Sequence, residues 1–197
     1  MSTVTVRVAD HEEIGASAKS LASAFYDDPV CGFAWPDDRK RLRRLERSFA
    51  SQLHILWGRR ELHTDPDVSA VAVWARPDEW EFPRMAVARF LLTSARTRVR
   101  LAALRAYLRT EALHPDEPHW YLEFLGTIPE RQEHGLGGRV LAAGLDRADE
   151  EGLPVWTWSS NARNLAFYHR HGFVVLDELP FARGGPAIYP IRREPRQ

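Results

Sequence analysis

The sequence predicts one α/β domain of 197 residues, and three observations carry this prediction. Residues 3–8 alternate Val with Thr or Arg, which is the period-two pattern of a strand with one buried face. Residues 39–57 place apolar side chains at spacings of three and four, which is the stripe of an amphipathic helix. Further strand-like runs alternate with helical ones, and 44% hydrophobic residues supply one core. The apolar stripe of residues 39–57 consists of Leu42, Leu45, Phe49, Leu53 and Leu56.

Local signals justify each element in turn. Asp10 is a helix N-cap followed by two glutamates, and the helix must stop before Pro29. A DPD turn favours a hairpin of two strands, and Gly152 ends a later helix. The expected order is strand 3–8, helix from near 11, helix 39–57, strands 61–64 and 68–75, strand 120–128, helix 137–151, strand 155–158, short helix within 161–173, and strands 173–179 and 187–193.

Composition excludes several classes of protein. The formal net charge is zero, so the whole-molecule field gives no argument for nucleic acid or a membrane. Cys31 is the single cysteine, which excludes an intramolecular disulfide and argues against structural zinc, and we predict no metal. The first residues lack a signal-peptide pattern, and no apolar run reaches about 18 residues. We therefore expect a cytoplasmic protein that does not span a membrane.

One segment is unusual. The pattern predicts a helical insertion at about 80–117, and its stretch 84–110 holds seven arginines without Asp or Glu. Three interpretations stay open: a solvated helix surface, a wall that attracts an acidic acceptor or phosphates, and a nucleic-acid patch. We favour the solvated surface, and we rank the nucleic-acid patch last because aromatic residues are sparse there and the rest of the chain offsets the charge.

The most informative stretch is RQEHGLGG, residues 131–138, between a strand and a helix. Backbone N–H groups at such a helix start, freed of side-chain bulk by glycine, form an anion cradle. A Walker A loop is excluded because no Lys follows Gly135 or Gly138, and a dinucleotide loop because Val140 stands where its third glycine belongs. The remaining pattern is Gln/Arg-x-x-Gly-x-Gly/Ala, although a plain tight turn would read the same.

A second segment, NARNLAFYHRHGF at 161–173, follows about 25 residues later. Together the two closely resemble the acetyl-CoA-binding core of the GCN5-related N-acetyltransferases (GNAT superfamily). HWYLEFLGTIP, AVAVWARP and GGPAIYPIRRE resemble its puromycin N-acetyltransferase-like branch. The resemblance covers nearly the whole chain and is strongest over residues 120–173. It implies a mixed, mostly antiparallel sheet of about seven strands, with helices on both faces and with strands four and five splayed apart.

The resemblance also implies how acetyl-CoA binds. The pantetheine arm lies between the splayed strands, along residues 124–127, where backbone N–H groups steady the thioester carbonyl. We expect Gly126 to mark a bulge there. The loop amides take the pyrophosphate, although Glu133 stands where the family often has Gly, and His134 where it often has Lys or Arg. The expected cofactor-binding residues are Leu125, Gly126, Thr127, Gln132, Glu133, His134, Gly135, Leu136, Gly137, Gly138 and Asn164.

Two residues are candidates for proton transfer. Tyr168 matches the family tyrosine that returns a proton to the thiolate, with a packed core tyrosine as the alternative. Glu123 is an acid inside an apolar strand, where burial would raise its pKa to a value useful for a general base. It could equally lie on a solvated face or pair with an insertion arginine. Asn161 is explained as a helix cap, which leaves Asn164 as the pantetheine partner.

The expected function is acetyl-CoA-dependent N-acetylation of a primary amine on a small molecule, such as an antibiotic or amine metabolite. Trp35 and Trp158 are the candidate acceptor-binding residues. The alternative is a non-catalytic acyl-CoA-binding sensor of the same fold. We expect no nucleic-acid or membrane partner, and either a monomer or a homodimer.

Overall fold

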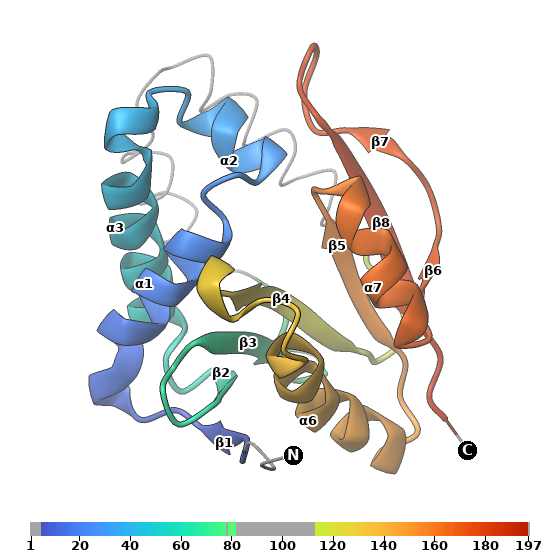
Figure 1. Ribbon diagram of the computed structural model, residues 1–197. Coiled ribbons are helices and arrows are strands. Elements are labelled where there is room, and N and C mark those ends of the chain that lie inside the picture. The colour runs from blue at the N-terminus through green and yellow to red at the C-terminus, as the bar shows by residue number, and fades with distance from the viewer. Residues whose placement is uncertain (1–4, 78, 82–112, 197) are drawn as a thin grey trace.

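A computed structural model describes residues 5–77, 79–81 and 113–196. Its central feature is an open eight-stranded sheet in the order β1-β2-β3-β4-β5-β8-β6, with β7 paired to β8 (Figure 1). The strands are β1 (Arg7–Val8), β2 (Arg60–Thr64), β3 (Ala70–Ala75), β4 (Trp120–Thr127), β5 (Val155–Ser159), β6 (Val174–Val175), β7 (Leu179–Pro180) and β8 (Ala187–Arg193). The predicted fold class is confirmed, although the final pair is divided into three strands.

Helices cover both faces of the sheet. On one face lie α1 (Ile14–Ala24) and α3 (Asp38–Leu56), and on the other α6 (Leu136–Glu150) and α7 (Leu165–Arg170) (Figure 1). Short 3-10 turns η1 (His11–Glu13), η2 (Pro129–Arg131) and η3 (Ala162–Asn164) lead into these elements, and α2 (Pro29–Ala34) follows α1. Helix α2 was not predicted.

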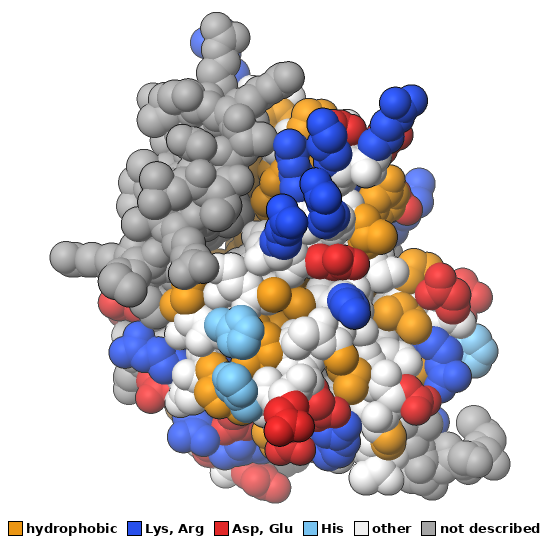
Figure 2. Space-filling model, turned by 90° about the vertical axis from the view of Figure 1, so that its left-hand side faces the viewer, with side chains coloured by type: hydrophobic (Ala, Val, Ile, Leu, Met, Phe, Trp, Pro, Cys, Tyr) orange, Lys and Arg blue, Asp and Glu red, His pale blue; other side chains and the backbone are white. Residues whose placement is uncertain are grey.

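The predicted helix stripe is confirmed with one exception. Leu45, Phe49, Leu53 and Leu56 of α3 are buried, whereas Leu42 is 42% exposed. Leu42 precedes the part of α3 that packs on the sheet. Lys and Arg side chains gather near the α3 N-terminus on the face that Figure 2 shows, with a few acidic ones among them. These basic side chains form a solvated surface.

The Arg-rich segment expected at 80–117 lies mostly outside the described residues. Its two ends meet: the rings of Trp80 and His114 stack with centroids 3.8 Å apart. His114 also contacts Trp156 of β5, with centroids 4.1 Å apart. Burial and the neighbouring His119 lower the pKa of His114 to about 3, so the His114 ring is neutral near pH 7. The chain therefore leaves and rejoins the sheet at one aromatic cluster on β5.

Candidate functional site

A gap opens between β4 and β5. These parallel strands pair only at Trp120↔Val155 and Tyr121↔Trp156, although β4 continues to Thr127. At the point of separation the Thr157 hydroxyl donates to the Leu122 carbonyl at 2.6 Å. The expected splay of strands four and five is thus present, and a side chain closes its inner end.

The edge of β4 that faces this gap carries backbone donors. Ile128 N–H donates to Ser69 O on the β3 side, at 2.9 Å. Because hydrogen-bonded and non-hydrogen-bonded pairs alternate in an antiparallel ladder, Leu125 and Thr127 direct their N–H and C=O groups away from β3. The Thr127 carbonyl already accepts from the Gln132 side chain, at 3.0 Å. The Leu125 and Thr127 N–H groups are therefore placed to bind an extended ligand in the gap.

The prediction of a bulge at Gly126 is wrong. Val73 pairs with Phe124 and Trp74 with Leu122, so the extra residue is Glu123. Gly126 has another reason to be glycine, because a Cβ there would lie 2.8 Å from the Ala24 Cβ. Helix α1 therefore approaches β4 closely beside the gap.

The loop 132–138 presents a row of backbone N–H groups. Gly135 has a left-handed φ of 75° and precedes α6, whose first backbone hydrogen bond runs from Arg139 N–H to Gly135 O at 3.2 Å. No hydrogen bond between described residues uses the N–H groups from 133 to 138. A Cβ on Gly137 would lie 3.0 Å from the Thr127 hydroxyl. This arrangement fits the helix-start cradle that a diphosphate requires.

Two loop residues depart from the family pattern. Glu133 has a φ of 64°, a conformation that glycine adopts without strain, which explains why glycine is common at this position. His134 Nδ1 lies 2.6 Å from the Gln132 carbonyl, and both side chains are exposed. The structure therefore turns His134 toward its own loop.

Glu123 lies in an ion pair. Its Oε2 is 2.5 Å from Arg60 Nε, and the two side chains are 2% and 0% exposed. Arg60 also donates to the carbonyls of Glu79 and Trp80, at 2.6 and 3.0 Å. A neighbouring guanidinium stabilises the carboxylate form that a general base needs, but it also lowers the drive to take up a proton. Arg60 is a residue of β2 and not one of the insertion arginines.

Tyr168 and the two asparagines occupy the α7 side of the gap. Burial first, and the negative charge of Asp28 second, raise the pKa of the Tyr168 phenol, which is therefore protonated at neutral pH. Asn161 caps η3 by accepting from Arg163 N–H at 3.0 Å, as expected. Asn164 is exposed at the α7 start and remains the candidate pantetheine partner.

The two candidate acceptor residues lie in different surroundings. Trp35 is 8% exposed and belongs to the core cluster under α1 and α3. Trp158 is half-buried and contacts two apolar clusters, one at α2 and one at Trp156. Trp158 thus lies on the α1 side of β5, beside the gap.

Asp28 was not among the predicted site residues, and it caps α2 by accepting from Val30 and Cys31 N–H at 2.9 and 3.0 Å. The Ser160 hydroxyl, just beyond β5, donates to its other oxygen. An Asp directly before Pro is an N-cap followed by a proline at the first helical position, and this signal could have revealed α2.

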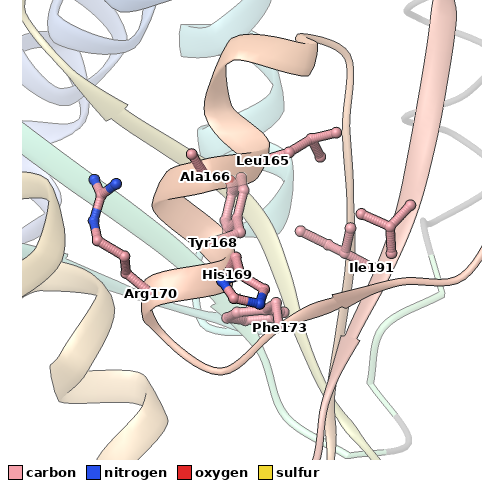
Figure 3. A pocket seen from close by; sticks show the side chains of 8 residues that line it. Leu165, Ala166, Tyr168, His169, Arg170, Phe173 and Ile191 are labelled. Carbon is pink, nitrogen blue, oxygen red and sulfur yellow. The ribbon is translucent and has the colours of Figure 1, made fainter.

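A cavity of about 460 Å³ lies beside α7, where Leu165, Tyr168 and Ile191 contribute to its apolar wall (Figure 3). It lies between α7 and the β6–β8 edge and does not include the loop 132–138. Within the described ranges, no group of three or more His, Cys, Asp or Glu side chains is arranged to hold a metal ion. No helix of those ranges is long and apolar enough to cross a membrane.

Known proteins match this chain along its length. The model of the acetyltransferase (GNAT) family matches residues 10–173. An uncharacterized N-acetyltransferase of Schizosaccharomyces pombe is 25% identical over 203 residues, or 95% of this chain and 80% of that protein. A structure of histone acetyltransferase HPA2 and related acetyltransferase from Corynebacterium glutamicum has a TM-score of 0.73 at 23% identity, covering 100% of this chain and 98% of that one. The structure of arylalkylamine N-acetyltransferase 2 from Aedes aegypti has a TM-score of 0.66 at 10% identity, covering 99% of this chain and 100% of that one.

Proposed function

Since the chain belongs to the acetyltransferase (GNAT) family, we propose that it moves an acetyl group from acetyl-CoA directly to a primary amine of a small molecule. The family uses acetyl-CoA, which supplies the activated acetyl group as a thioester. The observation that carries the proposal is the gap between β4 and β5 beside the loop 132–138. A fold neighbour named as an arylalkylamine N-acetyltransferase supports an amine acceptor. The puromycin N-acetyltransferase-like branch and a cytoplasmic location stay predictions.

The loop and the β4 edge hold the coenzyme in this proposal. The N–H groups of 133–138 bind the pyrophosphate, and those of Leu125 and Thr127 bind the pantetheine and the thioester oxygen. Asn164 donates to a pantetheine amide. The other cofactor contacts that we propose come from Gly126, Gln132, Glu133, His134, Gly135, Leu136, Gly137 and Gly138.

Tyr168 and Glu123 move the protons. A lysine-like ammonium has a pKa of about 10.4, so at neutral pH the acceptor must lose a proton before it can attack. Glu123, directly or through a water, accepts that proton. Tyr168 is protonated and buried, and it donates to the departing thiolate. Both roles belong to general acid–base catalysis.

Glu123→Gln tests the base. A glutamine oxygen still accepts from Arg60 Nε, but the buried guanidinium loses its counter-charge, so we expect lower stability. Acetyl-CoA affinity should persist while kcat falls on the order of 10² to 10⁴. The kcat–pH profile of the wild type should have a limb on which kcat rises as Glu123 loses its proton, and the variant should lose that limb. Tyr168→Phe should lower kcat less, because water can replace the phenol. An unchanged kcat and profile in Glu123→Gln would assign Glu123 a structural role.

The buried Arg60–Glu123 pair favours a second candidate, a protein of this fold that binds acyl-CoA without turnover. Acetyl-CoA should raise the unfolding temperature in both cases, by a stabilisation of about 2.7 kcal/mol at 100 times its dissociation constant. ATP and NAD should not. Release of CoA with a broad panel of amines separates the two candidates, since only the enzyme produces it.

A further inference from the structure

The chain between α1 and α2 crosses the gap between β4 and β5. Ala24, at the end of α1, lies against Gly126 of β4, where a Cβ would approach its own Cβ to 2.8 Å. Four residues later, Asp28 accepts a hydrogen bond from Ser160, directly after β5. Residues 24–28 therefore extend from one separated strand to the other on the α1 side. Asp28 lies at the mouth of the gap, opposite the face covered by α6 and α7.

Asp28 is a buried carboxylate without a cationic partner among the described residues. It is 9% exposed, and its hydrogen-bond partners are the backbone N–H groups of Val30 and Cys31, the Ser160 hydroxyl and the Cys31 thiol, all of them neutral. Arg41 directs its guanidinium to the carbonyls of Trp35 and Tyr26 instead. Buried charges are ordinarily paired with an opposite charge.

Helix capping explains the position of Asp28 but not its charge. Asn and Ser cap a helix about as well as Asp does, and a neutral side chain is less costly to bury. The negative charge acts on its surroundings: together with the larger effect of burial, it raises the pKa of the Cys31 thiol and of the Tyr168 phenol. The carboxylate is thus electrostatically coupled to the residue that we place beside the reacting sulfur.

Helix α2, which Asp28 caps, packs against an apolar cluster. Val30 and Phe33 of α2 pack against a cluster that contains Phe181 and Ile188, and the rings of Phe33 and Phe181 meet edge to face at 6.3 Å. Trp158, two residues before Ser160, packs against the same cluster. A ligand that reaches Asp28 therefore meets an apolar and aromatic wall.

We propose that Asp28 binds the ammonium group of the acceptor, and that the acceptors are alkylamines carried on an apolar or aromatic body. The acceptor supplies the positive charge that the buried carboxylate lacks, and the wall of Phe33, Trp158 and Phe181 contacts its body. This assignment rests on the proposed function, because only an acetyl transfer to an amine gives the protein an acceptor. Its test is a binding measurement that needs no turnover.

The test compares 2-phenylethylamine with 2-phenylethanol, which carries a hydroxyl in place of the ammonium. Calorimetric titration is done at pH 7 with CoA bound, so that no acetyl group is present to transfer. Wild type should prefer the amine by about 30-fold or more, the effect expected for a buried hydrogen-bonded charge pair. Asp28→Asn keeps the cap but removes the charge, and it should abolish the preference while leaving affinity for the alcohol unchanged.

Two further variants complete the design. Asp28→Ser also caps α2 and should lose the preference in the same way, which guards against a folding defect peculiar to one substitution. Asp10→Asn removes an exposed capping carboxylate at η1 and should leave the preference intact. Equal affinities for the two probes in wild type, no binding of the amine at millimolar concentration, or a preference retained in both Asp28 variants would overturn the assignment. CoA release on the amine panel reports separately on acetyl transfer.

Discussion

Replacing Gly144 by Ala should push α6 away from the sheet. A Cβ at this buried position would lie 2.2 Å from Cε2 of Trp74, about 1.2 Å short of an ordinary 3.4 Å contact. Trp74 is fully buried in β3, and its indole is rigid. Overpacking of this kind costs up to about 3 kcal/mol, and better helix propensity returns about 1 kcal/mol. The net loss of about 2 kcal/mol should lower the unfolding temperature by about 4–8 °C.

Gly15→Ala is the matched control. Gly15 lies in α1, and a Cβ there meets nothing within 4 Å, so the same substitution should stabilise the protein by up to about 1 kcal/mol. Thermal unfolding of both variants measures the difference. Because α6 carries the loop 132–138 at its start, Gly144→Ala should also weaken acetyl-CoA binding, whereas Gly15→Ala should not. A Gly144→Ala protein as stable as Gly15→Ala would refute the contact.

Two further predictions concern charged residues. Glu133→Gln removes an acid beside the proposed pyrophosphate, so acetyl-CoA affinity should rise, and this gain should shrink as salt is added. Glu133→Gly should raise the free energy of unfolding by about 0.5–1 kcal/mol, because glycine adopts the left-handed backbone of this position without strain. Equal stability of the two variants would exclude strain at this position. Arg7 lowers the pKa of Glu13 from 4.5 to about 2, so this pair contributes stability above pH 4.5 that is lost as the pH falls toward 2. Urea unfolding of Glu13→Gln should therefore show a smaller decline between pH 5 and 3 than wild type.

Periodicity was sufficient for the long elements of this fold. The stripe that predicted a helix at 39–57 corresponds to α3 at Asp38–Leu56, because a repeat over five turns averages out single exceptions such as Leu42. Hydrophobic periodicity could not reveal α2, because a helix of six residues is too short to show a period. Only the Asp28–Pro29 pair marks that helix in the sequence.

The partners of the site residues were not predictable, because they are distant in the chain. Glu123 meets Arg60, 63 residues away, and the register that makes Glu123 the bulged residue depends on β3. Gly126 illustrates the same limit. A glycine within a strand indicates a bulge or a close approach, and only the position of α1 decides between them.

The position of β8 has a consequence for how the sheet is assembled during synthesis. In the described sheet β8 lies between β5 and β6, so β6 hydrogen-bonds to a strand that the ribosome makes later. Until β8 emerges, Val174, Val175 and Leu176, each at least 50% exposed even in the finished fold, belong to a segment without a place in the sheet. Completion of the fold must therefore follow translation of residues 187–193, and a nascent chain stalled before them presents an apolar strand to chaperones or to other chains.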